Sequence, residues 1–141
     1  MYNIIRNAIL PYVNESDPVW EEFGVESVRT IFETFSTNEW ECFIQEIQED
    51  VPDIDVRLID CLTQMDSTEA LMAAVEMAKI CSESAFTLFV IRLDDGRLAK
   101  ISHSDLALLV NKACLQEKNF QGRFAVIYKE ATNNMRKFLK V

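Results

Sequence analysis

The residue types of a hydrolase triad occur together in one short segment, Ser102-His103-Ser104-Asp105. A triad works only where its nucleophile, base and acid converge in space, and neighbours along one chain rarely do so. Serine hydroxyls just ahead of an apolar helical pattern are instead typical of helix caps. We therefore expect this segment to cap a helix, His103 to lie in an exposed loop, and the protein not to be an enzyme.

The spacing of the glycines and cysteines argues against nucleotide and zinc sites. A phosphate-binding loop needs glycines close together, whereas Gly24, Gly96 and Gly122 are isolated. A zinc site needs paired ligands, and the chain has no C-x-x-C pair and a single histidine. We expect no cofactor and no metal, and four reduced thiols packed as small apolar side chains. The cysteines are Cys42, Cys61, Cys81 and Cys114.

The densest group of carboxylates in the sequence surrounds Pro52. Its spacing does not match an EF-hand loop, and no glycine is present for the turn that such a loop needs. A charge run of this kind is either a solvated corner between two helices or a surface that binds a partner. The residues predicted to bind a partner are Glu39, Glu46, Glu49, Asp50, Asp53 and Asp55.

The charge of the chain is divided unequally between its two halves. Residues 1–70 contain sixteen acids and three bases, a net charge of −13, and residues 71–141 contain seven acids and eleven bases, a net charge of +4. The acidic half should repel nucleic acids and anionic membranes and attract basic surfaces. The distribution therefore predicts a protein partner, and neither a nucleic acid nor a membrane.

The length and composition predict a single domain over residues 1–141, because 141 residues of which 49% are hydrophobic suffice for one independent core. The longest uninterrupted apolar run, Ala70 to Val75, is far shorter than the ~20 residues of a membrane-spanning helix. The first fourteen residues lack the basic start and the long apolar run of a signal peptide. These features predict a cytoplasmic protein.

Apolar residues recur with helical spacing along most of the chain. Trp40, Phe43, Ile44 and Ile47, for example, occupy one face of a helix that ends before Pro52. Trp20 and Trp40 both lie on stripes that should face the core. The fold predicted from these patterns is mainly α, a compact bundle of about six to eight short antiparallel helices joined by short connections.

One segment departs from the helical pattern. Residues 86–93 are rich in aromatic and β-branched side chains, and Asp95-Gly96 follows before a second apolar run. Asp-Gly between two such runs favours a β-hairpin, here over residues 86–101. A helix over residues 84–93 stays open, because so short a run does not separate a strand from a buried helix.

Two stretches, residues 38–44 (NEWECFI) and residues 55–62 (DVRLIDCL), look like short paired helices of the HEAT-like kind. In overall character, an acidic, compact helical chain of this size resembles the immunity proteins of bacterial polymorphic-toxin systems, including contact-dependent growth inhibition. The resemblance implies a protein that binds and neutralises a cognate toxin, commonly a basic nuclease, through an acidic surface. A helical adaptor or regulatory subunit that binds another protein is the alternative.

Overall fold

The computed structural model describes residues 1–49 and 54–139, and every regular element within these residues is helical. The prediction of a mainly α fold built from short helices is confirmed. The first half contains α1 (Tyr2–Ile9), the 3-10 turn η1 (Leu10–Tyr12), α2 (Asp17–Val19), the π-helical turn η2 (Trp20–Gly24), α3 (Val25–Glu33), α4 (Thr37–Glu49) and α5 (Asp55–Gln64). The second half contains α6 (Thr68–Ile80), α7 (Glu83–Arg92), α8 (Asp95–Leu98), α9 (His103–Gln116), the 3-10 turn η3 (Glu117–Asn119) and α10 (Gly122–Leu139).

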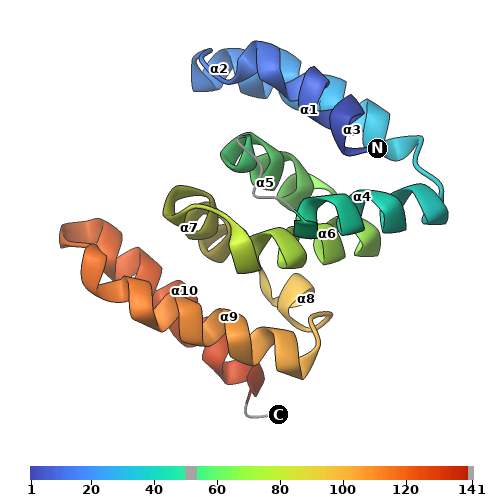
Figure 1. Cartoon of the computed structure of the whole chain (residues 1–141). Helices are drawn as coiled ribbons and strands as arrows, with labels where there is room; N and C mark the ends of the chain where they lie inside the picture. The colour runs from blue at the N-terminus through green and yellow to red at the C-terminus, as the bar shows by residue number, and fades with distance from the viewer. Residues whose placement is uncertain (50–53, 140–141) are drawn as a thin grey trace.

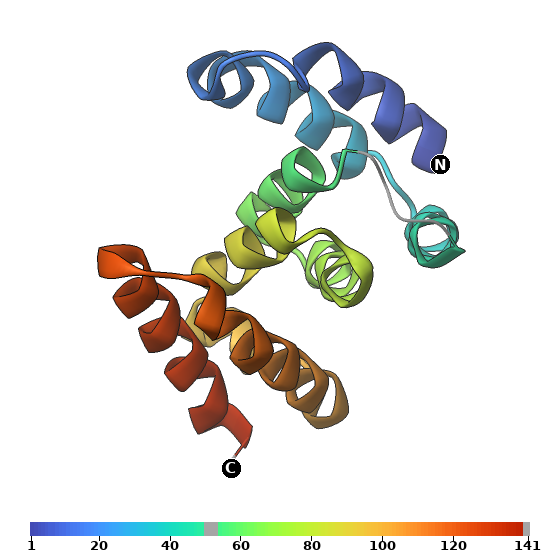
Figure 2. The ribbon, with the colours of Figure 1, turned by 60° about the vertical axis from the view of Figure 1, so that its left-hand side comes forward.

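The helices stack in two rows (Figure 1). Row A consists of α1, α4, α6 and α9, and row B consists of the continuous segment α2–η2–α3 followed by α5, α7 and α10; consecutive members of each row contact one another. Figure 2 shows α4 and α6 end-on at one side of the stack, with α5 and α7 at the other. Each row A helix is followed along the chain by a row B helix, so the fold is a stack of helix pairs, as in HEAT-like proteins.

Local capping explains why several of these helices begin where they do. Ahead of α4, the Ser36 hydroxyl accepts a hydrogen bond from the Glu39 N–H (3.2 Å), and the Glu39 carboxylate accepts one from the Ser36 N–H (3.1 Å). This reciprocal pair is a capping box. Ser82 caps α7 and Ser102 caps α9 through their side-chain oxygens. The predicted capping role of Ser102 is thereby confirmed.

The hairpin predicted over residues 86–101 is wrong, because this region forms α7 and α8. Phe86, Phe89 and Val90 have helical spacing and are fully buried. Their aromatic and β-branched character therefore reflects a helix in the middle of the stack and not a strand. The Asp94 side chain accepts a hydrogen bond from the Arg97 N–H (2.8 Å), so Asp95-Gly96 is the first turn of α8 and not a hairpin turn.

Large apolar side chains from both rows form one continuous core. Trp20 is fully buried and Trp40 is 7% exposed, as their positions on the helical stripes predict. The four cysteines are free thiols. Cys61 is buried and burial raises its pKa to about 12, which suits an unreactive core thiol. Cys42 is exposed, however, so the prediction that all four thiols pack as apolar side chains is wrong for this residue.

Candidate functional site

Three of the six acidic residues predicted to bind a partner have described side chains, and each has an intramolecular role. Glu39 belongs to the capping box of α4. Glu46 accepts a hydrogen bond from the backbone N–H of Tyr2 (2.6 Å) and lies 3.5 Å from the N-terminal amine. Asp55 is 8% exposed and accepts a hydrogen bond from the Ser82 N–H (2.8 Å) at the start of α7.

The rest of that set lies outside the described part of the structure. Asp50 and Asp53 are not described, and neither is the side chain of Glu49. The binding role of the set stays a prediction. Asp55, however, is committed to holding α5 against α7, since its carboxylate caps a helix in the next pair of the stack.

The residue types of a triad at the start of α9 do not converge. His103 is exposed on the first turn of α9, and its Nε2 lies 3.0 Å from the carbonyl oxygen of Leu139. Ser102 caps the helix, and the Asp105 carboxylate pairs with Lys79 at 2.8 Å. These side chains contact different partners, and their contacts cap α9 and hold it against α6 and α10.

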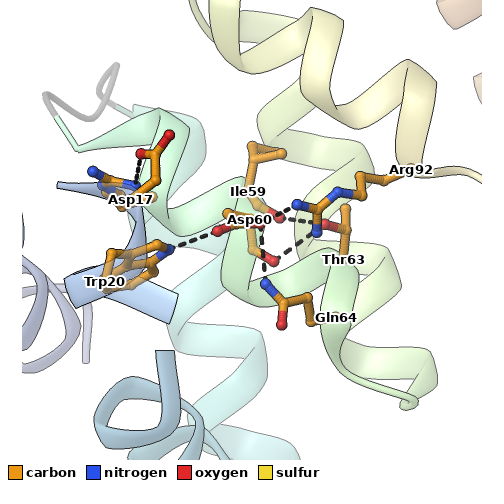
Figure 3. A network of polar contacts seen from close by, with 8 residues as sticks. Asp17, Trp20, Ile59, Asp60, Thr63, Gln64 and Arg92 are labelled. Atoms are coloured by element: carbon orange, nitrogen blue, oxygen red, sulfur yellow. Dashed lines mark hydrogen bonds and ion pairs between the residues drawn. The ribbon is translucent and has the colours of Figure 1, made fainter. Parts of the chain in front are cut away.

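A buried carboxylate, Asp60, joins three consecutive members of row B (Figure 3). Its Oδ2 accepts a hydrogen bond from the Trp20 indole N–H (2.6 Å), and its Oδ1 pairs with the Arg92 guanidinium (2.7 Å). Trp20 belongs to η2, Asp60 to α5 and Arg92 to α7. Because the Asp60 side chain is only 9% exposed, these contacts fix the position of η2 against the rest of the stack.

Arg57 makes a second link between η2 and α5. Its guanidinium donates to the Asp17 carboxylate (2.9 Å) and to the Glu15 carbonyl oxygen (3.0 Å), and it lies over the Trp20 ring at 5.4 Å. Arg57 is itself mostly buried, with 15% of its side chain exposed, whereas the Asp17 side chain is 81% exposed. The Arg57 guanidinium is therefore occupied by contacts inside the fold, whereas the Asp17 carboxylate with which it pairs remains accessible to solvent.

The π-helical turn between α2 and α3 places the indole of Trp20 directly against Gly24. A Cβ at Gly24 would lie 2.2 Å from the Trp20 Cε3 and 2.9 Å from the Tyr12 Cγ, so no side chain fits there. Such turns are rare and occur frequently at functional sites. Here the turn buries Trp20 and Gly24 and leaves the intervening Phe23 with 55% of its surface exposed.

Phe23 is surrounded by acidic residues on the outer side of this segment. It lines a shallow hollow with Glu22, Glu26, Ser27 and Thr30, and we call these five residues the acidic end surface. All five are exposed; Glu26 makes a surface ion pair with Arg29 at 3.8 Å, and its side chain remains 70% exposed. Residues 17–33 contain five acids and one base, a net charge of −4. An exposed aromatic ring flanked by carboxylates can anchor a partner with a basic surface.

A second hollow lies in row A between α6 and the start of α9. It has a volume of about 230 Å³ and a mostly apolar lining that includes Leu71, Met72 and Val75. Glu76 and Asp105 stand at its polar edge, where the Lys79 ammonium bridges their carboxylates at 2.8 Å each. Periodicity alone did not indicate this hollow, because Lys79 and Asp105 are far apart in the sequence and meet only when α6 and α9 stack.

Two contacts between row A helices, made by Asp105 and by Glu46, make the stability of the fold depend on pH in the acidic range. The hydrogen bond from Lys79 lowers the pKa of Asp105, although partial burial opposes it. Burial raises the pKa of Glu46, but the Tyr2 N–H, the Cys42 thiol and the N-terminal amine together outweigh burial and leave the pKa below its ordinary value.

A carboxylate whose pKa is lower in the folded than in the unfolded chain stabilises the fold above its unfolded pKa, about 4, and loses this effect as the pH falls through the folded pKa. We therefore expect the urea midpoint to fall as the pH decreases from about 5 to about 2. The double variant Asp105→Asn/Glu46→Gln should show a flatter acid limb, whereas the exposed control Asp66→Asn should follow the wild type. Parallel curves for all three proteins would contradict this assignment.

Among residues 1–49 and 54–139, no helix combines the length and apolar character needed to cross a bilayer. The same residues contain no group of three or more histidine, cysteine or acidic side chains arranged to hold a metal ion. No family model, curated protein or solved structure matches the chain.

Proposed function

We propose that this protein is a non-catalytic binding protein whose acidic end surface binds a basic protein. The observation that carries the proposal is Phe23, which is 55% exposed between Glu22 and Glu26 on a segment held rigidly by the Trp20–Asp60 hydrogen bond. A large aromatic side chain held rigidly loses little conformational freedom on binding, and surrounding carboxylates accelerate encounter with a basic partner. This surface replaces the corner around Pro52 as the favoured binding site.

For the class of partner, we propose a toxin domain that the protein neutralises, as an immunity protein would. Two features support this class: the net charge of −9 and the resemblance in overall character, which is the size and helical content of the chain. An acidic surface can occupy a cleft that a nuclease uses for phosphates. The alternative, a helical adaptor, would use the same surface on a basic partner that is not toxic.

The test is affinity capture from the native cells, with secreted proteins included, using three immobilised forms of the protein. We expect the wild type to retain a basic protein. The variant Glu22→Gln/Phe23→Ala/Glu26→Gln should bind this protein with an affinity at least about tenfold lower, since truncation of a hot-spot residue typically costs about 2 kcal/mol or more of binding free energy. The control Glu41→Gln/Asp66→Asn alters two exposed acids elsewhere and should behave as the wild type.

Two further measurements separate the partner classes. Association with the retained protein should slow as salt increases, because steering between exposed charges is screened. Expression of the retained protein alone should arrest growth, and co-expression of the wild type should restore it. Retention of the same protein by all three immobilised forms would refute the acidic end surface, and a retained protein that is harmless would favour the adaptor.

A further inference from the structure

The last helix of the stack, α10, has an outer side that no other helix covers among residues 1–49 and 54–139. It buries Tyr128, Thr132 and Met135 against α7 and α9. With 3.6 residues per turn, Val126 and Lys137 lie on the opposite side of the helix, flanked by Ile127 and Lys129. Val126 is 57% exposed and Ile127 is 50% exposed, and both lysines are exposed.

This outer side is basic, in contrast to the first pair of the stack. Residues 122–139 contain four bases and one acid, a net charge of +3, against the −4 of residues 17–33. We call the exposed residues Arg123, Val126, Ile127, Lys129, Glu130 and Lys137 the basic end surface, which holds three bases and one acid. The two ends of row B therefore carry opposite charges; the acidic end exposes Phe23, and the basic end exposes Val126 and Ile127.

Contacts within row B show in which direction neighbouring helices of the row pack against each other. Trp20 and Asp17 of the first segment contact Asp60 and Arg57 of α5, and Asp60 contacts Arg92 of α7. Farther along, Asn119 in η3, just before α10, bonds to Glu83 at the start of α7, and Asn134 in α10 bonds to Asp95 in α8, just after α7. Residue numbers rise together in all these pairs, so the row B helices run parallel. A second copy that continued row B would set its own α3 beside α10 in the same direction.

From this complementarity we propose that the chain associates head to tail with a second copy of itself, through the acidic end surface of one copy and the basic end surface of the other. The exposed Phe23 ring of one copy covers Val126 and Ile127 of the other, while Glu22 faces Arg123 and Glu26 faces Lys129. Such a contact is heterologous, so it can propagate into longer chains of copies. Because it buries one end of a small stack, its affinity belongs to the weak class of interfaces and depends strongly on salt.

The test is the mass in solution, measured by sedimentation equilibrium with two charge-reversed variants. The head variant is Glu22→Lys/Glu26→Lys, and the tail variant is Arg123→Glu/Lys129→Glu. At about 10 mM ionic strength, where the Debye length is about 30 Å, the wild type should exceed the 16.3 kDa of one chain as concentration rises. At about 1 M, where that length is about 3 Å, it should return to one chain.

Each variant alone should stay at the mass of one chain, because the residues of its two end surfaces then carry net charges of the same sign. An equimolar mixture of the two should associate again, since the reversed head of one matches the reversed tail of the other. The control Glu41→Lys/Asp66→Lys changes the net charge by the same amount as the head variant and should associate as the wild type does. If circular dichroism shows that the head variant is unfolded, Glu22→Gln/Glu26→Gln and the wild type should be compared instead.

Three outcomes would overturn the proposal: a wild type that stays at one chain at low salt, a single variant that associates fully, or a mixture that does not associate. Binding of the monomeric wild type to phosphatidylserine vesicles would assign the basic end surface to a membrane instead. The tail variant leaves the acidic end surface intact, so it should still capture the basic partner. Failure of self-association is thereby distinguishable from failure of the proposed function.

Discussion

Replacement of Asp60 by alanine is expected to lower the free energy of unfolding by about 3–5 kcal/mol. The Asp60 carboxylate receives the indole N–H of Trp20 at 2.6 Å and the Arg92 guanidinium at 2.7 Å, and it is nearly buried. Removal of the carboxylate leaves the fully buried Trp20 N–H without its acceptor and the Arg92 cation without its counterion. Urea titration at pH 7 measures the loss.

A double-mutant cycle separates the hydrogen bond from the rest of the effect. Trp20→Phe removes the indole N–H while it keeps an aromatic ring, so Asp60→Ala should cost less in that background than in the wild type. The exposed control Asp66→Ala should change stability by about 0.5 kcal/mol or less. A loss of about 1 kcal/mol or less for Asp60→Ala would show that the three helices do not depend on this carboxylate.

The substitution Gly24→Ala is expected to destabilise the protein by about 3 kcal/mol, the upper end of the usual cost of overpacking. Its methyl group would lie 2.2 Å from the Trp20 ring, and Trp20 cannot retreat without breaking its bond to Asp60. Alanine favours a helix over glycine by about 1 kcal/mol, so helix propensity alone predicts the opposite sign. The direction of the change therefore decides between the two effects.

Gly96→Ala is the matched control for that experiment. A Cβ at Gly96 would meet only the Asp94 Oδ1 at 3.5 Å, an ordinary contact, and the residue lies in α8. This variant should be as stable as the wild type or more stable, by up to about 1 kcal/mol. Equal effects of the two substitutions in urea titration would contradict the close packing of Trp20 on Gly24. Trp20 and Phe23 belong to the same turn, η2, so Gly24→Ala should weaken partner binding even where the protein remains folded.

Local chemistry allowed much of the fold to be predicted from the sequence. Side-chain caps such as Ser102 act within one turn, and apolar residues at helical spacing identify the buried faces of Trp20 and Trp40. The hairpin prediction failed for the same local reason. The segment from Phe86 to Arg92 is apolar because α7 lies in the middle of the stack, and a short apolar segment has the same composition in a buried helix and in a strand.

The amino-acid sequence by itself determined the helical character, the caps, the acidic first half and the basic second half. Only the tertiary structure decided which charged side chains remain accessible to a partner. Asp55 and Asp60 are consumed by contacts with residues about 30 or 40 positions away, whereas Glu22 and Glu26 stay exposed beside Phe23. The physical reason is that desolvation and ion pairing depend on which helices stack together, and that pairing is not written in the spacing of residues along any one helix.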